Sequence, residues 1–507
     1  MVRACLYRPR GGSGPGRTTQ FDATEIPLSQ AFVSPRQTAR VADIADRRRL
    51  AESAHATDGH YLSMDGFWEW LAHRREAVRM DVELIPLADL NRWGFETGTG
   101  NIVHETGRFF SVEGVRARLG GEGGATWDQP IINQPEIGYL GILVKEIDGV
   151  LHCLMQVKAE PGNAQGLQLS PTVQATRSNY TGVHRGSAVR YLEYFNGPQQ
   201  GRVLVDVLLS EHGSWFYHKR NRNMVVEVTE DVPEHEDYCW LTIGQVRNLL
   251  QAEDLVNMDT RTVLACIPLD EASTAAAPIG ASAFQTALLA SLPSEAPAVH
   301  ALPELLRWFT DVKARAELVS ERIPLGSIEK WITTREEIRH ESGNDFSIVA
   351  VSVSARSREV TQWTQPLLRT RAEGTIAFLA RRFDGVVHVL VHAGVEPGFA
   401  DAIELGPTVQ FIPDSYGSPL TAGYQPYLKE ILAAAPEQVR YGVTQSEEGG
   451  RFYQVLSRYM VVEIDHDVPA HEDFRWMTVG QLVALLQHSH YVKVQARSLI
   501  ACLQSIW

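Results

Sequence analysis

Short apolar stretches separated by polar turns run through the chain, a pattern typical of a strand-rich protein. Residues 139–147 and 150–157 are two such stretches. The Asp148-Gly149 dipeptide between them favours a type I′ turn, so we expect a β-hairpin there. Residues 202–209 and 215–228 predict a second pair of strands. Together these patterns indicate a β-sheet in the first half of the chain.

Other segments carry apolar residues at helical spacing. Residues 65–78 and 302–318 predict amphipathic helices, because their apolar side chains would share one face. Residues 240–250 predict a third helix, in which Thr242 and Gln245 have the spacing of a capping box. We therefore expect sheets flanked by helices, which is an α+β fold.

The chain also repeats itself. His104 and His340 are separated by 340 − 104 = 236 positions, and short motifs far apart in the first half recur at the same offset. This offset relates Trp127 to Trp363, Asp148-Gly149 to Asp384-Gly385, Glu160-Pro161-Gly162 to Glu396-Pro397-Gly398, and Arg261 to Arg497. A constant offset over so long a stretch indicates an internal duplication.

The duplication divides the chain into four segments. Residues 1–60 are rich in Gly, Arg, Ser and Thr, and predict a loosely ordered tail. Residues 61–269 form the first repeat, and residues 300–507 form the second. Residues 270–299 are rich in Ala, Ser and Pro, as in a linker with room for a short helix. Each repeat is expected to be a mixed sheet flanked by helices.

Composition narrows the class of protein. A net charge of −14 over 507 residues argues against nucleic-acid binding, which needs a basic surface. No run of about 18 apolar residues is present, so no membrane span is expected. The five cysteines lack metal-ligand or CxxC spacing and predict reduced thiols, and no apolar leader opens the sequence. We therefore expect a cytoplasmic protein.

The two repeats differ in their polar residues, and the differences point to a site in the first repeat. A position that serves only the shared scaffold should stay polar in both copies. Six polar positions of the first repeat change in the second: Lys158, Asn163, Gln168, Ser170, Arg177 and Asn179 become Gly394, Phe399, Glu404, Gly406, Pro413 and Ser415. The first repeat is therefore the better candidate for the working site, and the second is expected to be catalytically degenerate.

The stretch after residue 214 behaves in the same way, because Lys219 and Arg220 become Val455 and Leu456. Alternation along a strand would place His218, Arg220 and Arg222 on one face and Trp215, Tyr217, Lys219 and Asn221 on the other. Guanidinium groups grip phosphate oxygens and an aromatic ring stacks on a base, so both faces suit a phosphorylated ligand. The alternative is a solvated strand face with ordinary ion pairs.

Several catalytic motifs are absent from the sequence. There is no GxGxxG opening a helix, no GxxxxGK[ST], no HExxH and no GxSxG. This disfavours enzymes that use a nicotinamide or a nucleoside triphosphate, and neither a cofactor nor a metal is expected.

Six stretches of the first repeat are distinctive: EGVR (113–116), QPIINQPEIG (129–138), EPGN (160–163), GLQLSPTVQATRSNY (166–180), GSWFY (213–217) and KRNRNMVVE (219–227). In these stretches the chain resembles the NDP-hexose 2,3-dehydratases, and the resemblance extends from about residue 67 to residue 503. It implies a Nudix-like fold for both repeats and a homodimer. The metal-binding Nudix helix is missing, so neither bound magnesium nor pyrophosphate hydrolysis is expected.

The resemblance also implies a reaction, the 2,3-dehydration of dTDP-4-keto-6-deoxy-D-glucose in deoxysugar biosynthesis. Its product would be a 3,4-diketo-2,6-dideoxy sugar nucleotide, which an NADPH-dependent 3-ketoreductase would then reduce. The dehydration needs a base at C3, a proton donor and a group that stabilises the enolate. No redox cofactor is required, which agrees with the missing dinucleotide motif.

For these roles the first repeat offers Glu160 or His184 as base, Lys158 at the enolate oxygen and Tyr180 as proton donor. The groups expected at the diphosphate are Arg177, Lys219, Arg220 and Arg222, and those expected at the sugar or base are Asn163, Gln168, Ser170 and Asn179. Gln174, Ser178, Trp215 and Asn221 complete the predicted binding set. Two other functions stay open, a non-catalytic sugar-nucleotide-binding protein and a Nudix-type pyrophosphohydrolase.

Overall fold

The structure is a computed structural model of an α+β protein. It describes residues 43–59, 61–121, 124–176, 189–197, 200–269, 280–343, 346–355, 361–413 and 425–507, all of which belong to one compact unit. The order of elements in the first half recurs in the second, as the duplication predicts. None of the described helices is long and apolar enough to cross a membrane.

The described part of the first half has two helices, then a series of strands, then two further helices. Its helices are α1 (Ile44–His55), α2 (Met64–Ala77), α4 (Ile243–Leu249) and α5 (Met258–Ala265). Its strands are β1 (Met80–Ile85), β2 (Trp93–Phe95), β3 (Ile102–His104), β4 (Ser111–Leu119), β5 (Ala125–Asn133), β6 (Gly138–Ile147), β7 (Val150–Ala159), β8 (Leu167–Ser170), β9 (Val173–Ala175), β10 (Arg202–Ser210), β11 (Phe216–Tyr217), β12 (Arg220–Val228) and β13 (Tyr238–Thr242).

The second half repeats this order. Its helices are α6 (Ala283–Leu289), α7 (Leu302–Arg315), α8 (Leu428–Leu432), α9 (Val479–Leu486) and α10 (Val494–Gln504). Its strands are β14 (Leu318–Ile323), β15 (Trp331–Thr333), β16 (Glu337–His340), β17 (Ser347–Ala355), β18 (Gln362–Arg369), β19 (Gly374–Phe383), β20 (Val386–Val395), β21 (Ile403–Gly406), β22 (Val409–Phe411), β23 (Val439–Ser446), β24 (Leu456–Glu463) and β25 (Phe474–Thr478).

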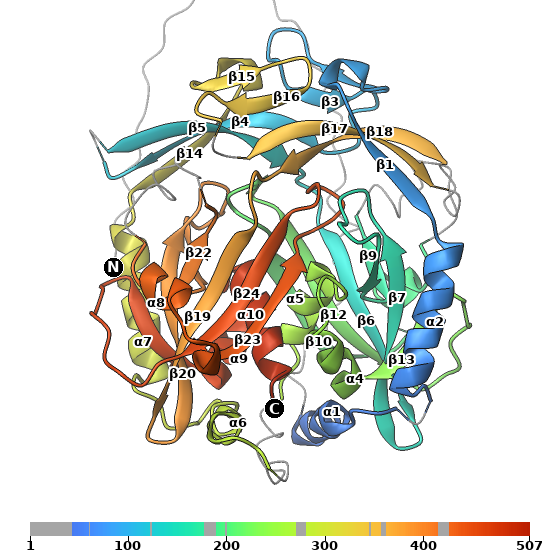
Figure 1. Ribbon diagram of the computed structural model, residues 1–507, viewed down its shortest axis with the longest axis vertical. Coiled ribbons are helices and arrows are strands. Elements are labelled where there is room, and N and C mark those ends of the chain that lie inside the picture. The colour runs from blue at the N-terminus through green and yellow to red at the C-terminus, as the bar shows by residue number, and fades with distance from the viewer. Residues whose placement is uncertain are drawn as a thin grey trace, which may run out of the picture. The chain divides into compact units, whose positions relative to one another are not determined.

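Each half contributes a seven-stranded mixed sheet (Figure 1). The first has the order β10-β12-β6-β7-β13, with β8 beside β7 and β9 beside β6, and the second has the order β23-β24-β19-β20-β25 with β21 and β22 in the matching places. The predicted hairpin is confirmed as β6 and β7. Asp148 and Gly149 between them both have positive φ, 50° and 81°, as a type I′ turn requires.

The two smaller sheets exchange strands between the halves. In the first half, β4 pairs with β3 and β5, but also with β14 of the second half. In the second half, β17 pairs with β16 and β18, and also with β1 of the first half. Figure 1 shows β14 beside β4 and β5, and β1 beside β17 and β18. The halves are therefore joined by backbone hydrogen bonds, as well as by packing.

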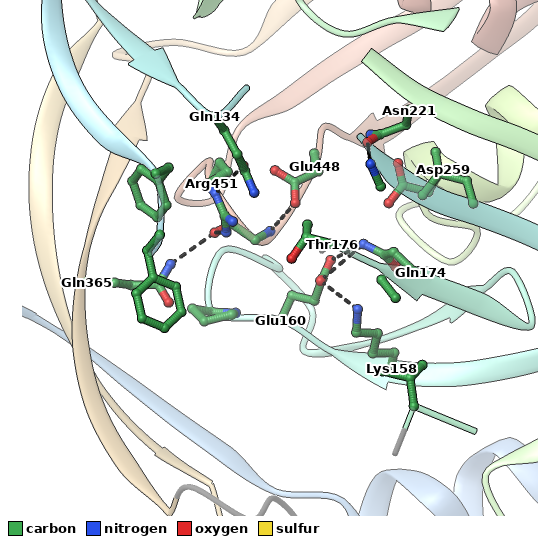
Figure 2. A pocket seen from close by; sticks show the side chains of 18 of the residues that line it. Gln134, Lys158, Glu160, Gln174, Thr176, Asn221, Asp259, Gln365, Glu448 and Arg451 are labelled. Atoms are coloured by element: carbon green, nitrogen blue, oxygen red, sulfur yellow. Dashed lines mark hydrogen bonds and ion pairs between the residues drawn. The ribbon is translucent and has the colours of Figure 1, made fainter. Parts of the chain in front are cut away.

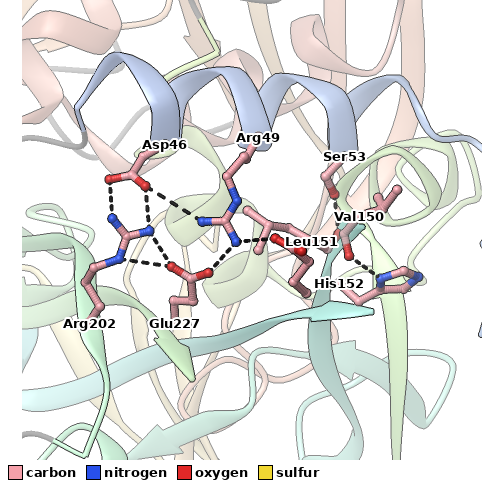
Figure 3. A network of polar contacts seen from close by, with 9 residues as sticks. Asp46, Arg49, Ser53, Val150, Leu151, His152, Arg202 and Glu227 are labelled. Carbon is pink, nitrogen blue, oxygen red and sulfur yellow. Dashed lines mark hydrogen bonds and ion pairs between the residues drawn. The ribbon is translucent and has the colours of Figure 1, made fainter. Parts of the chain in front are cut away.

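The N-terminal helix α1 belongs to the fold, so the prediction of a loose tail up to residue 60 was wrong for residues 44–55. Leu50 is fully buried against the sheet, and Arg49 binds Glu227 and Glu146 at 2.5 and 2.7 Å (Figure 3). Ser53 donates to the carbonyl of Leu151 and accepts from the backbone N–H of Ile243 at the start of α4. The composition does not predict this helix, because it is held by polar contacts and by only a few buried apolar residues, Leu50, Ala51 and Ala54.

The segment predicted as a linker contains the equivalent helix. Residues 283–289 form α6, whose Phe284 and Leu288 are buried. Ser291 donates to the carbonyl of Val387 and accepts from Val479, as Ser53 does at the equivalent positions of the first half. Each repeat therefore begins before the boundary that the sequence suggests.

Two predicted elements have other boundaries than the sequence suggests. The helix predicted for 240–250 begins only at Ile243, because Thr242 is its N-cap, and the confirmed capping box with Gln245 leaves 240–242 in β13. The strand predicted for 215–228 is broken at His218, whose φ is 51°. Residues 216–217 pair with β5 of a small sheet, and only residues from Arg220 onward join the large one.

Helices α5 and α10 pack between the large sheets, and each carries a fully buried arginine. Arg261 donates to the carbonyl of Ser446 in the second half at 2.6 Å, and Arg497 donates to the carbonyl of Ser210 in the first half at 2.7 Å. Because a buried guanidinium must have partners, each arginine fixes the end of a strand in the opposite half. The loops that follow these strands are thereby held in place.

Candidate active site

A cavity of about 640 Å³ is lined by residues of both halves (Figure 2). The first half supplies side chains from β7, β9, β12 and α5 of its large-sheet layer and from β2, β3 and the 109–110 segment of its small sheet. The second half supplies residues 362–365 of β18 and parts of the loop between β23 and β24. Neither repeat alone forms this site.

Lys158 and Glu160 face the cavity from the end of β7. They lie two residues apart, so alternation puts both side chains on one face of the strand. Lys158 Nζ lies 3.0 Å from Glu160 Oε1, and Gln174 Nε2 donates to the same carboxylate at 3.2 and 3.3 Å. The side chain of Glu160 is 10% exposed, and that of Lys158 is 20% exposed. A cation and an amide therefore hold a partly shielded carboxylate in one orientation.

Lys219 and Asn221 reach the cavity from the start of β12. Lys219 Nζ donates to the carbonyl of Glu136 at 2.5 Å, and burial lowers the pKa of Lys219 to about 8. Asn221 Nδ2 donates to Glu211 at 2.8 Å. The buried ammonium of Lys219 would be stabilised by an anionic ligand in the cavity.

Three further carboxyl groups border the cavity, those of Glu211, Asp259 and Glu448. Each has one oxygen that is inaccessible to solvent and has no hydrogen-bond partner among the residues that the structure describes. Burial raises the pKa of Asp259 well above its ordinary value. Burial also raises the pKa of Glu448 to about 7, with Arg451 opposing the rise and Glu160 and Glu211 adding to it. Burial thus favours the protonated forms of Asp259 and Glu448.

The loop between β23 and β24 carries Glu448 and Arg451 into the site. It is fixed to the first half through Gly162, which donates to the carbonyl of Gly449 and accepts from the backbone of Gln454, both at 2.7 Å. A Cβ at Gly162 would lie 1.6 Å from the carbonyl oxygen of Phe452, so only glycine permits this approach. The Glu160-Pro-Gly turn thus serves as the docking point for the other half.

Arg451 and a group of aromatic rings form the remaining wall. Arg451 Nε donates to Gln134 at 3.2 Å, and its guanidinium lies 4.3 Å from the ring centre of Phe110. The rings of Trp93 and Phe110 are 4.8 Å apart, and those of His104 and Phe109 are 4.5 Å apart. A cation beside flat apolar surfaces can accommodate both a phosphate and a planar ring.

Five of the predicted site residues line the cavity together: Lys158, Glu160, Gln174, Lys219 and Asn221. Three others lie behind it and hold local structure. Gln168 donates to Asp254 and Ser446, Ser170 accepts from Asn257, and Asn163 donates to the carbonyl of Gly166.

Trp215, Arg220 and Arg222 also lie outside the cavity lining. Arg222 forms an ion pair with Asp206 at 2.5 Å. This agrees with the alternative interpretation of the sequence, in which the arginines of this strand form ordinary ion pairs. Trp215 stacks on His212 and packs against Phe452. Arg177, Ser178, Asn179, Tyr180 and His184 fall outside the residues that the structure describes.

Sequence reasoning missed Glu448 and Arg451, although a signal for both was present. At the 236-residue offset Glu448 replaces His212, and Arg451 replaces Trp215. The predicted site rests on polar residues that are present in the first repeat and lost in the second, and not on polar residues that only the second repeat has. Asp259, which corresponds to Gln495, was missed because it lies on a buried helix.

The equivalent of Glu160 in the second half is Glu396. Its Oε1 lies 2.9 Å from Lys493 Nζ and accepts from Gln410 at 3.3 Å, and its Oε2 accepts from the backbone of Ser214 at 2.9 Å. The side chains of Lys493 and Glu396 are only 6% and 4% exposed. Here a loop of the first half covers the carboxylate of the second.

Among the residues that the structure describes, no group of three or more His, Cys, Asp or Glu side chains is placed to hold a metal ion. The cysteines that the structure describes, Cys153, Cys239, Cys266 and Cys502, are buried and free.

Comparison with known proteins gives a consistent result. A family model described as NDP-hexose 2,3-dehydratase matches residues 64–267 and again 302–503, one match in each half. A protein of Saccharopolyspora spinosa named dTDP-4-dehydro-6-deoxy-alpha-D-glucopyranose 2,3-dehydratase is 50% identical over 464 residues, which cover 91% of this chain and 95% of that protein. Proteins with the same name from Amycolatopsis orientalis and Streptomyces violaceoruber are 45% and 46% identical, over 91% and 87% of this chain and 94% and 97% of their own lengths.

Proposed function

The chain belongs to the NDP-hexose 2,3-dehydratase family, and on that premise we propose that it removes water from C2 and C3 of dTDP-4-keto-6-deoxy-D-glucose. The C4 ketone acidifies the proton on C3. Loss of that proton and of the C2 hydroxyl gives an enol, which tautomerises to the 3,4-diketo-2,6-dideoxy sugar nucleotide. The observation that carries the proposal is the Lys158–Glu160–Gln174 group, which faces a cavity large enough for a ligand.

Within this proposal Glu160 is the base that takes the C3 proton. Its carboxylate is oriented by two partners and accessible from the cavity, so a substrate hydrogen could replace solvent beside it. Lys158 supplies positive charge next to it, where the enolate oxygen develops negative charge. The second half has Gly394 in place of Lys158, so this arrangement of base and cation is specific to the first half.

Lys219 and Arg451 suit the diphosphate, because both are cations at the cavity wall. The rings of Trp93 and Phe109 suit the thymine base, since a planar heterocycle stacks on aromatic faces. The remaining predicted binding residues, Arg177, Ser178, Asn179 and Tyr180, and the alternative base His184 stay candidates from the sequence.

The test is to incubate the protein with dTDP-4-keto-6-deoxyglucose and to follow the nucleotide sugar by mass spectrometry. We expect loss of one water, and trapping of the diketone should confirm it. A protein that only binds sugar nucleotides would leave the substrate mass unchanged and its C3 proton unexchanged. A Nudix-type hydrolase would instead release dTMP and a sugar phosphate in a magnesium-dependent way.

Four further expectations accompany this function. The product is a reactive diketone, so an NADPH-dependent 3-ketoreductase should consume it in the same pathway to a glycosylated natural product, such as an antibiotic. We also propose that each half has a Nudix-like fold, that the protein is a homodimer and that it works in the cytoplasm. Light scattering on the purified protein would test the dimer, and a monomeric mass would contradict it.

A further inference from the structure

The loop of the second half that closes the site carries a carboxyl group with no role in the reaction as described so far. Glu448 Oε1 accepts from the backbone of Gly450 at 3.1 Å, and its Oε2 is buried without a hydrogen-bond partner among the described residues. Its side chain lines the cavity. The dehydration needs an acid to protonate the departing C2 hydroxyl, because hydroxide is a poor leaving group.

Comparison of the two copies shows how unusual this position is. At the equivalent place the first-half loop carries His212, whose Nε2 lies 3.0 Å from the buried carboxylate of Glu447. Burial alone would raise the pKa of Glu447, yet the hydrogen bond and charge of His212 bring it below its ordinary value. In the cavity the corresponding residues are Glu448 and Glu211, two carboxyl groups in place of an imidazole and a carboxylate. Two buried carboxylates repel, and the charge of Glu211 helps to raise the pKa of Glu448.

The position of Glu448 suits the stereochemistry of the substrate. In a sugar of gluco configuration, the hydrogen on C3 and the hydroxyl on C2 lie on the same face of the ring. A base and an acid that act on them must therefore lie side by side. An ideal Cβ at Gly450 would lie 2.4 Å from Glu448 Oε1 and 3.6 Å from Glu160 Oε1, so both carboxyl groups border one point of the cavity wall.

We propose that Glu448, contributed by the second half, is the catalytic acid that protonates the departing C2 hydroxyl while Glu160 acts at C3. The C3–H bond breaks and its proton goes to Glu160. The electron pair forms the C2–C3 double bond, and the C2–O bond breaks as Glu448 gives its proton to the leaving oxygen. Tautomerisation restores both groups, because C2 takes a proton from Glu160 and the 3-hydroxyl returns one to Glu448. The inference rests on the proposed dehydratase function.

The electrostatic surroundings fit an acid that works near neutral pH. Burial raises the pKa of Glu448 to about 7, Arg451 of its own loop opposes the rise, and Glu160 and Glu211 add to it. The charged groups that face Glu448 from the neighbouring elements are Lys158 in β7, Glu160 directly after β7, Glu211 after β10, Lys219 before β12, Asp259 on α5 and Arg451. Among the described residues, none of the three cations is an ion-pair partner of Glu448, since Lys158 is bound to Glu160, Lys219 to the carbonyl of Glu136, and Arg451 to Gln134 and the carbonyl of Gly450.

The experiment separates proton removal from water loss in the full-length Glu448→Gln variant. In D₂O with dTDP-4-keto-6-deoxyglucose, we expect water loss at least about 100-fold slower than in the wild type. Recovered substrate should still acquire deuterium at C3, because Glu160 is intact. The wild-type kcat should fall as the pH rises above about 7, where Glu448 loses its proton, and the variant should lack this fall.

Glu447→Gln is the matched control, since it makes the same change at the preceding residue, which pairs with His212 and does not line the cavity. It should lower the melting temperature while keeping the wild-type ratio of water loss to exchange. Wild-type water loss in Glu448→Gln would overturn the inference and leave Glu160 serving both steps. Parallel loss of exchange and water loss in a folded variant would also overturn it. A wild-type protein that shows neither reaction would instead refute the proposed function.

Discussion

The environments of Glu160 and Glu396 differ although the two residues are equivalent. Each follows the last residue of a strand, β7 or β20, and each carboxylate accepts from a glutamine, Gln174 or Gln410. Around Glu160 the cation is Lys158 of the same strand, and the pair faces the cavity. Around Glu396 the cation comes from the N-cap of α10 and the pair is almost completely buried.

Two glycines explain why Lys493 can reach Glu396. Gly394 replaces Lys158 and Gly406 replaces Ser170, which leaves space that Lys493 fills. A Cβ at Gly394 would lie 2.7 Å from Lys493 Nζ. A shared carboxylate has thus kept a cationic partner in both copies, but only in the first copy does the partner stand at an open cavity. Access from the cavity, and not the carboxylate alone, is therefore what makes Glu160 the candidate base.

The largest effect is expected when the two equivalent carboxylates are replaced in turn. Glu160→Gln removes the proposed base and should lower turnover about 10²–10⁴-fold with little loss of folded protein. Glu396→Gln should keep the turnover of its folded fraction, but lower the melting temperature, because it leaves Lys493 buried without a counter-charge. Equal losses of turnover in both variants would show that the two sites are not functionally distinct.

The second effect concerns stability, and it is expected at the buried ion pair of the second half but not at an exposed one. Lys493→Met removes one partner of a buried ion pair, and we expect about 3–5 kcal/mol less unfolding free energy in a denaturant titration. Lys313→Met is the control, since its partner Asp401 is 58% exposed and such pairs contribute less than about 1 kcal/mol. Similar costs for the two substitutions would mean that the Glu396 pair is not buried in solution.

A somewhat smaller effect is expected for the cation of the first half. Lys158→Ala removes the charge beside the developing enolate and should lower kcat about 10²–10³-fold, measured as loss of water from the substrate. Lys145→Ala, which removes a lysine paired with the exposed Asp231, is the control and should leave kcat unchanged. Turnover near the wild-type level in Lys158→Ala would exclude Lys158 from the mechanism.

The smallest effect concerns the pH dependence of stability that Glu448, the counterpart of His212, is expected to cause. A folded-state pKa raised to about 7 means that the folded protein holds a proton that the unfolded chain loses above its ordinary pKa. Stability therefore falls as the pH rises toward 7, and Glu448→Gln should abolish this fall. We expect the unfolding free energy of the variant to exceed that of the wild type by about 1–3 kcal/mol at pH 8, and the two to be equal near pH 4. The same gain at both pH values would place its origin elsewhere.

Local features of the fold could be predicted well from the sequence. The Asp148-Gly149 turn, the capping box at Thr242 and the duplication all depend on residues close together or on a constant offset, and all are present. The helix α1 could not be predicted, because Arg49 is satisfied by Glu227, a residue distant in sequence. The break at His218 was hidden for the same reason, since its two flanking segments pair with different sheets.

For the site, the sequence predicts the chemistry of one wall. Lys158, Glu160, Gln174, Lys219 and Asn221 lie in the polar stretches of the first repeat that carry the family resemblance or differ from the second repeat, and the structure brings them together. That the opposite wall comes from the second half follows from tertiary contacts alone. Strand exchange between the small sheets and the loops held by Arg261 and Arg497 place Glu448 and Arg451 there. Periodicity and offset describe each copy separately, whereas contacts between the copies depend on which surfaces bury one another when the chain folds.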